Sequence, residues 1–316
     1  MTGAAEKGDG VTEEAKDLSR LRLGTAPDSW GVWFPSHPNQ VPWNQFLDEA
    51  AAAGYKWIEL GPYGYLPTDP AQLREELAGR DLRLSGGTVI TGLQRGQEGL
   101  RQALDDCRAS ARLVAALGAR HLVVIPEPYR AEDGTLTWSR DLTPDEWADF
   151  MRGLSTLSRS IAEEFDVRCR FHPHADTHVA TGEAVERLLH DTPEETVSLC
   201  LDTGHVAYCG GDNAKLVQSY PSRIGYVHLK AVDPAVRRRV QEEDLPFAKA
   251  VALGVMVEPP HGEPAMPGLL SQLEGLGVDL FTIVEQDMFP CRPDAPLPIA
   301  MRTRRFLGSC GLGPVD

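Results

Sequence analysis

The sequence predicts a single-domain (β/α)8 barrel, the TIM-barrel fold, from three observations. Short apolar strands alternate with amphipathic helices, and eight such units occupy roughly 290 of the 316 residues. This alternation indicates a parallel sheet, and eight units match a closed barrel better than a doubly wound sheet. A Rossmann-like fold would need a GxGxxG motif after the first strand, where the chain reads PDSWG.

The barrel is expected to begin near Leu21, after a polar tail. Residues 1–18 are rich in Gly, Ala and Glu and show no periodicity, so we expect a disordered tail there and the catalytic domain over 19–316. The segment RLGTA forms the first strand. The loop after it, PDSWGVWFPSHPNQVP, carries three aromatic residues including Trp30, and loops at this end of barrel strands line substrate pockets.

The later elements follow from apolar periodicity and from residues that begin or end helices. Gly54 ends a helix at 43–53 and Gly118 ends one at 98–117, because glycine readily adopts the left-handed conformation found there. The capping sequence TPDE opens a helix at 143–165. The remaining expected strands are 57–60, 82–89, 121–126, 167–171, 198–201, 224–229 and 280–284, and the remaining helices are 70–79, 182–190, 212–219 and 297–308.

One region departs from the alternation. Residues 231–267 are too long for a single connection in a compact domain. They contain FAKAVALGVMVEPPHGEP, which we interpret as a helix plus an ordered loop over the barrel mouth.

Composition limits the function. The net charge of −15 opposes a nucleic-acid partner, so we expect a small, neutral or weakly charged substrate. No apolar run reaches the roughly 18 residues of a membrane span, and the N-terminal residues lack the apolar core of a signal peptide. The six cysteines form no CxxC pair, which fits reduced thiols. We therefore expect a cytoplasmic protein that contacts no membrane.

Chemically active side chains follow two consecutive predicted strands. Asp202 ends the strand in SLCLDTGH, and His228 ends the strand in GYVHLK, with Lys230 two residues further on the same face. Taken singly, Asp202 could be a turn cap, His228 a core histidine and Lys230 a surface lysine. Together at the carboxyl ends of parallel strands they indicate an active site, because barrel active sites are built there.

Two further strands supply metal-ligand residue types. The fifth strand ends in His172-Pro173-His174 and the last strand is followed by Glu285. We expect His172, Asp202, His228 and Glu285 to bind one divalent metal, with His174 as the alternative to His172. Two nitrogen and two oxygen ligands suit Mn²⁺, which we expect, or Co²⁺, Zn²⁺ or Fe²⁺, and they suit Ca²⁺ poorly.

Such a site favours enolisation chemistry. A carbonyl and an adjacent hydroxyl that chelate a divalent ion make the neighbouring C–H acidic, and a base can then remove the proton to give an enediolate. Glu285 and His174 are the candidate bases, and Lys230 or His205 would donate hydrogen bonds to the oxygen on which charge develops. The residues expected to contact the substrate are Trp30, Glu127 and His205.

The motifs LDTGH, VHLK, HPH and VEQD resemble the sugar phosphate isomerase/epimerase superfamily of xylose isomerase-like barrels over residues 21–310. That superfamily also includes inosose dehydratase and the apurinic endonucleases. Most of its isomerases and epimerases have a Glu as first ligand, at the position of His172 here. The HxH sequence together with Glu285-Gln286-Asp287 is closer to the inosose dehydratase branch. The histidine in place of the glutamate departs from an epimerase mechanism with two glutamates.

Three functions follow from this resemblance. The first is an enzyme that enolises a keto-sugar or keto-cyclitol, and then isomerises or epimerises it or expels a β leaving group, as a dehydratase or a 3-oxo-glycoside lyase does. The second, an abasic-site endonuclease, would need extra histidines from the second and third strands, and the chain has none between His37 and His121. The third is a sugar-binding subunit that depends on a partner. A homo-oligomer or a small partner subunit is compatible with each.

Overall fold

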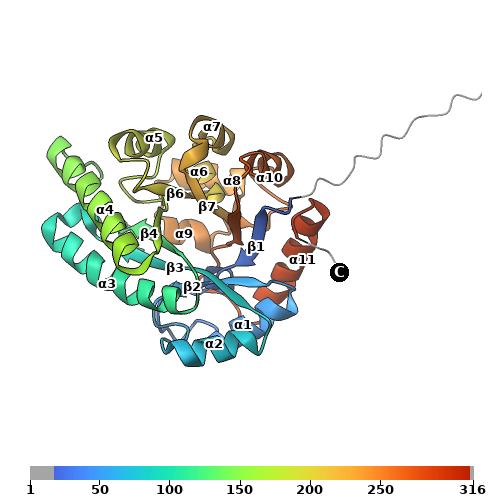
Figure 1. Ribbon diagram of the computed structural model, residues 1–316. Coiled ribbons are helices and arrows are strands. Elements are labelled where there is room, and N and C mark those ends of the chain that lie inside the picture. The colour runs from blue at the N-terminus through green and yellow to red at the C-terminus, as the bar shows by residue number, and fades with distance from the viewer. Residues whose placement is uncertain (1–17, 314–316) are drawn as a thin grey trace, which may run out of the picture.

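Eight parallel strands close into a barrel in the computed structural model, which describes residues 18–313, and this confirms the expected fold (Figure 1). The strand order around the barrel is β1-β10-β7-β6-β5-β4-β3-β2. The barrel strands are β1 (Leu21–Thr25), β2 (Trp57–Pro62), β3 (Arg83–Thr91), β4 (His121–Pro126), β5 (Arg168–Phe171), β6 (Ser198–Asp202), β7 (Ile224–Leu229) and β10 (Leu280–Val284). The sequence placed all eight.

Helices surround the barrel, as Figure 1 shows. The long α4 begins with the predicted capping box, in which Thr143 and Glu146 exchange hydrogen bonds. The helices are α1 (Trp43–Ala52), α2 (Pro70–Ala78), α3 (Gln97–Ala116), α4 (Pro144–Phe165), α5 (Gly182–Asp191), α6 (Thr203–Tyr208), α7 (Asn213–Ser219), α8 (Pro234–Glu242), α9 (Phe247–Ala252), α10 (Met266–Glu274) and α11 (Pro296–Ser309), with short 3-10 turns at Pro27–Trp30, Leu93–Arg95 and Pro221–Arg223. The sequence did not predict α6, α8 or α10.

Alternation along the strands explains where the polar residues lie. Cys200, Tyr226 and Ile283 belong to a buried apolar cluster with Val123 and Ala26. Two residues further along the chain come Asp202, His228 and Glu285, the last directly after β10, and side chains two apart in an extended chain share a face. The polar side chains therefore lie above an apolar layer, at the carboxyl end of the barrel.

The region predicted as one helix and an ordered loop contains more structure. It holds α8 and α9 and a two-stranded antiparallel sheet of β8 (Ala231–Val232) and β9 (Met256–Val257). A separate apolar cluster stabilises residues 231–267, with Phe247, Ala250 and Met256 packed on Ala175 and Tyr208. Because Phe247 also lines the large cavity at the mouth, the region does cover that mouth.

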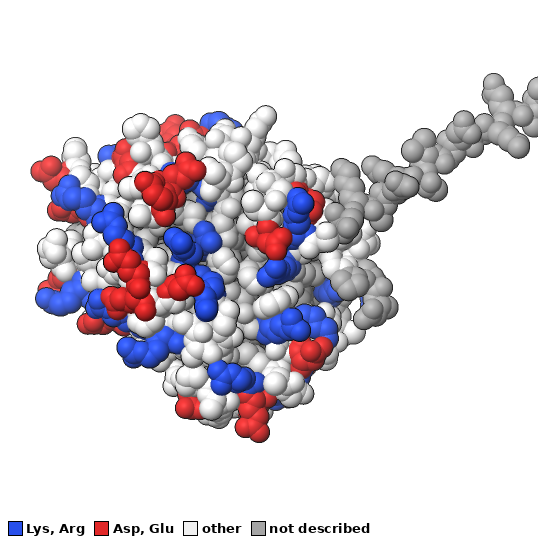
Figure 2. Space-filling view, in the orientation of Figure 1, with Lys and Arg blue, Asp and Glu red and all other residues white. Residues whose placement is uncertain are grey.

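The structure bears on the expected N-terminal tail, on membrane contact and on the expected surface charge. The tail lies outside the described residues except for Leu18, which is buried. Within the described residues, no helix combines the length and apolar character that a membrane span requires. Basic and acidic side chains intermix on the face shown in Figure 2, which presents no broad basic area there for a phosphate backbone.

Candidate metal centre and cavity

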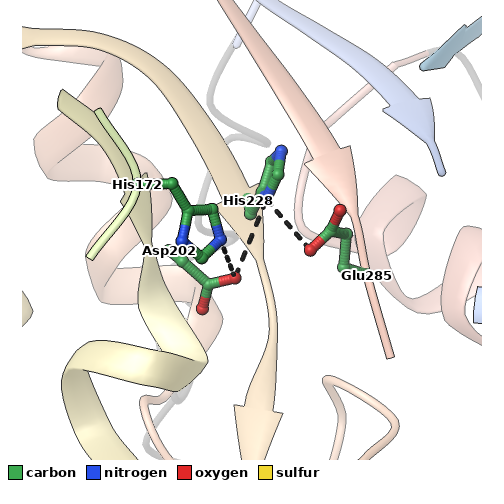
Figure 3. Close-up of side chains that lie close together, drawn as sticks. All are labelled: His172, Asp202, His228 and Glu285. Atoms are coloured by element: carbon green, nitrogen blue, oxygen red, sulfur yellow. Dashed lines mark hydrogen bonds and ion pairs between the residues drawn. The ribbon is translucent and has the colours of Figure 1, made fainter. Parts of the chain in front are cut away.

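Four side chains at the carboxyl ends of four strands point toward one another at the mouth (Figure 3). His172, Asp202, His228 and Glu285 are all buried, and each offers one ligand atom within 4.8 Å of the other three. His172 Nε2 lies 3.2 Å from Asp202 Oδ2. His228 Nδ1 lies 2.9 Å from Glu285 Oε2 and 3.7 Å from Asp202 Oδ2. The structure thus brings together the four expected ligands.

Asp202 uses its two carboxylate oxygens differently. Oδ1 accepts a hydrogen bond of 2.6 Å from the His205 backbone N–H and so caps α6. Oδ2 faces His172 and lies 3.3 Å from Lys230 Nζ. Asp202 therefore caps α6 through Oδ1 and faces the other expected ligands through Oδ2. The hydrogen bond at Oδ1 holds Oδ2 toward the mouth.

Lys230 is not a surface lysine, since only 2% of its side chain is exposed. Its Nζ lies 2.8 Å from Asp287 Oδ2 and 3.0 Å from Glu285 Oε2, with Asp202 and Asp28 further away at 3.3 and 3.7 Å. Burial by itself lowers the pKa of Lys230, but these carboxylates outweigh it and raise the pKa well above its usual value. The ammonium group therefore remains charged beside the four expected ligands.

The residues after Asp202 fit closely against this lysine. Thr203 Oγ1 donates to the Lys230 carbonyl at 2.6 Å and accepts from the Lys230 backbone N–H at 2.8 Å. A Cβ at Gly204 would lie 2.5 Å from Lys230 Cγ, which is closer than packed atoms approach. The glycine of the LDTGH motif is therefore required by the path of the Lys230 side chain.

Glu59 belongs to the site and was not predicted from the sequence. It is fully buried in β2, where its Oε2 lies 3.0 Å from His228 Nε2 and its Oε1 accepts from Thr88. A carboxylate can only accept, so His228 Nε2 carries the hydrogen and Nδ1 is left to face Glu285. Carboxylates in this position commonly orient a metal-binding histidine.

We expect Glu59→Gln to weaken divalent-metal binding by roughly 10–100-fold, the usual effect of losing the carboxylate behind a ligating histidine. Titration of purified protein with Mn²⁺ or Zn²⁺ measures the change. Glu76→Gln is a matched control, because Glu76 pairs with Arg80 outside the cavity. Wild-type metal affinity in Glu59→Gln would show that Glu59 does not orient His228.

The charge of the cluster suits a divalent cation. Burial raises the pKa of Asp202, but Lys230 and His205 outweigh it and hold the pKa well below its usual value, so this carboxylate is ionised. His228 Nδ1 is buried without a hydrogen bond despite its 2.9 Å approach to Glu285. Four acidic side chains share one lysine, namely Asp28, Asp202, Glu285 and Asp287, and a fifth, Glu59, pairs with His228. Buried charge of this kind is normally paired or bound to metal, so the residues fit the expected ion.

His174 lies beside the ligand group rather than in it. Its ring centroid is 5.7 Å from that of His172, and it lines the cavity. His174 Nδ1 donates to the Ala175 carbonyl at 2.8 Å, so the lone pair is on Nε2. Burial and the neighbouring His172 lower the pKa of His174 to about 3, so the ring is a neutral proton acceptor at pH 7.

A cavity of about 700 Å³ opens above the cluster. Trp30 does not line it, contrary to expectation, because the 3-10 turn places its indole in the core. There Trp30 Nε1 donates to Glu49 at 2.7 Å and the ring packs edge-on against Phe46. Trp33 and Phe34 of the same loop line the cavity instead.

Glu127 and His205 also lie outside the cavity lining. Glu127 forms a bidentate pair with Arg95, at 2.7 and 2.9 Å. His205 is buried behind His174 and Phe247, with ring centroids 3.9 and 4.8 Å away, and its Nδ1 accepts from the Ala175 N–H. Neither of these two expected substrate contacts therefore borders the cavity.

Comparison with known proteins finds a matching family and several similar proteins. The family described as xylose isomerase-like TIM barrel matches residues 47–307. An inosose dehydratase from Geobacillus kaustophilus is 31% identical over 287 residues, 87% of this chain and 90% of that protein. The rhizopine catabolism protein MocC from Rhizobium meliloti is 32% identical over 277 residues, 86% of this chain and 83% of that protein.

The fold is also found among solved structures. The IolI protein with a zinc atom bound superposes with a TM-score of 0.66 at 16% identity, covering 93% of this chain and all of that one (100%). At that identity the likeness concerns the fold alone. The zinc atom bound in IolI is a property of that protein.

Proposed function

The chain belongs to the xylose isomerase-like TIM-barrel family, and we propose that it is a divalent-metal-dependent lyase that eliminates water from a keto-cyclitol or keto-sugar. The observation that carries this proposal is the buried group of His172, Asp202, His228 and Glu285 beside a charged lysine in an open cavity. We propose Mn²⁺ as its metal. A bound divalent ion would polarise the substrate carbonyl and so acidify the adjacent C–H.

In the proposed reaction, the C–H bond next to the carbonyl breaks and its electron pair forms a C=C bond. The C–O bond at the β carbon then breaks, and the hydroxyl leaves with a proton as water. Glu285 or His174 takes the first proton. The Lys230 ammonium stabilises the negative charge that develops on the carbonyl oxygen, because it is fixed as a cation inside the site.

Asp28 is the proposed proton donor to the leaving hydroxyl. It lines the cavity, and neither of its carboxylate oxygens has a hydrogen-bond partner among the described residues. Burial and the nearby Glu285 raise the pKa of Asp28 well above its usual value, although Lys230 acts in the opposite sense. A carboxyl group whose pKa is raised holds its proton to higher pH, which suits general acid catalysis.

Elimination is favoured over epimerisation by the ligand set and by the relatives. An epimerase that moves a proton between two faces of the substrate uses two carboxylates, and the family resemblance puts His172 at the position of one of them. The inosose dehydratase from G. kaustophilus, 31% identical to this chain, carries out a dehydration by its name. Isomerisation or epimerisation of the same enolised intermediate is the second candidate, since it shares the first step.

The proposed substrate carries no phosphate. The cavity lining contains two lysine or arginine residues, Lys230 and Arg130. Both are already paired: Arg130 lies 3.1 Å from Asp244 and 3.4 Å from Asp176, and Lys230 has its own carboxylates. A phosphate would therefore enter a cavity whose cations are neutralised and whose lining holds more acidic than basic side chains.

The proposed function predicts water loss from a keto-cyclitol. Metal-loaded protein is incubated with inosose, or with a 3-oxo-glucoside, in D₂O and followed by NMR. We expect deuterium to enter beside the carbonyl and the β-hydroxyl carbon to become part of an unsaturated ketone. Exchange without loss of the hydroxyl would favour the epimerase, and no exchange with either substrate would contradict enolisation.

A further inference from the structure

The mouth of the barrel has two unlike halves. The four ligand residues and Lys230 come from β5, β6, β7 and β10 or directly follow them. The neighbouring strands β2, β3 and β4, with the residues just after them, add the apolar side chains of Tyr63, Ile90, Ile125 and Pro128 to the cavity lining, beside the polar Glu59 and Thr88 deeper in β2 and β3. Figure 1 shows these three strands side by side in the wall, away from β6 and β7. A molecule held at the polar half would extend over the apolar half.

The apolar half is exposed to an unusual degree. Ile90 is 56% exposed, the highest value among the large exposed hydrophobic side chains that the structure describes, and Tyr63 is 39% exposed. Ile90 pairs in register with Ile125 on the adjacent strand, so their side chains lie next to each other on one face. Apolar surface left open within a cavity favours a ligand that covers it, at about 25 cal/mol per Å².

The loop after β1 completes this surface. Trp33 is held by a 3.1 Å hydrogen bond from its indole N–H to Asp287, which also binds Lys230. Phe34 packs edge-on against Phe289 at 5.3 Å. These rings are therefore fixed beside the polar centre rather than free, and they face a cavity of about 700 Å³, within the range of roughly 300–1,000 Å³ typical of pockets for drug-sized ligands. A single six-membered ring leaves much of that volume unfilled.

We propose that Tyr63, Ile90, Ile125, Trp33 and Phe34 form an apolar subsite that binds an uncharged, planar group attached to the ring held at the metal centre. The substrate class is then a glycoside or ether of the keto ring that carries an aromatic substituent, rather than a bare cyclitol. This inference rests on the proposed function, because it takes the polar half to hold a sugar or cyclitol ring.

Binding of unreactive glycosides tests the subsite without requiring turnover. Calorimetry with metal-loaded full-length protein compares phenyl β-glucoside with methyl β-glucoside. We expect the phenyl compound to bind at least about tenfold more tightly, because burying one aromatic ring against the apolar surface is worth about one power of ten or more in affinity. Equal affinity for the two glucosides would overturn the proposal.

Two matched variants locate the effect. Ile90→Asp should remove the preference for the phenyl compound, and Val278→Asp should leave it unchanged. Val278 is also an exposed aliphatic residue, 47% exposed, but it precedes β10 at the opposite end of the barrel. Ile90→Ala repeats the test without adding charge, should the aspartate disturb folding. The same loss in both aspartate variants would contradict the subsite.

Other outcomes separate this proposal from its alternatives. If Ile90→Asp changes the oligomeric state in light scattering and leaves the phenyl preference intact, the surface contacts a second copy of the chain and the subsite is wrong. If the phenyl preference depends on Ile90 while no keto ring is dehydrated, the subsite stands and the proposed lyase function fails. The two ideas are therefore tested by different measurements.

Discussion

Asp202→Asn is expected to abolish metal binding and turnover while leaving the fold intact. Asparagine can still cap α6, because its side-chain oxygen can accept the His205 N–H as Oδ1 does now. It cannot supply the anionic Oδ2 that faces His172 and Lys230. Metal content by elemental analysis, thermal unfolding and turnover, all on one preparation, separate the two roles of this residue.

Further variants sharpen this prediction. Asp202→Ala should lose the metal and also the cap, which is worth about 0.5–2 kcal/mol of stability. Asp212→Ala is the control, since Asp212 caps α7 through the Lys215 N–H and lies outside the ligand group. It should lose a similar amount of stability and keep its metal. His228→Ala should resemble Asp202→Asn, because His228 provides the buried Nδ1.

Wild-type metal content in both Asp202→Asn and His228→Ala would remove the basis of the site assignment. Retention in one of them alone would mean that the remaining three residues hold the ion. Binding of three ions per chain would favour a nuclease-like centre instead, and would need ligands beyond the four residues that the structure brings together.

The strands and their terminal residues were predictable because the sequence repeats one pattern eight times. Asp202, His228 and Glu285 each follow a short apolar run, so the position of the strand also fixes the position of the side chain. Glu59 was not predictable by that reasoning. It lies inside β2, and in a closed barrel with both faces buried, sequence alternation alone does not tell which side chains point inward.

The loop after β1 also contains a residue whose position the sequence could not predict. Trp30 and Trp33 are three apart in a segment without periodicity, and the sequence gives no reason to prefer either as a substrate contact. The 3-10 turn at Pro27–Trp30 determines which tryptophan lines the cavity, because it turns Trp30 into the core and leaves Trp33 in the cavity wall. The short α6 escaped prediction because six residues are too few for a helical period to appear.

The burial of Lys230 was equally beyond the sequence. Its pairing depends on Asp28, Asp202, Glu285 and Asp287, which come from three distant parts of the chain. VEQD contains two of these acids, yet nothing local shows that both would reach one ammonium group. The site therefore depends on charged side chains that meet only in the folded barrel, and the residue pattern of one strand does not show which of them will meet.

Glu285→Gln is expected to lower turnover by roughly 10²–10⁴-fold, the usual contribution of a positioned general base, and to reduce metal occupancy less severely. Burial raises the pKa of Glu285, but His228 and Lys230 outweigh it and lower the pKa to about 2. The carboxylate is therefore fully ionised at neutral pH. Glutamine keeps the shape and one oxygen ligand but removes the charge and the basicity.

The measurement is metal content and solvent-proton exchange into the substrate on the same Glu285→Gln sample. Glu258→Gln is the control, because Glu258 pairs with Arg302 away from the cavity. Glu285 Oε2 is already paired with His228 Nδ1 at 2.9 Å and Lys230 Nζ at 3.0 Å. His174 lines the cavity, and its Nε2 is free of the hydrogen bond that Nδ1 makes to Ala175. Normal exchange with the metal retained would therefore transfer the role of base to His174, and His174→Gln should then stop exchange while the metal stays bound.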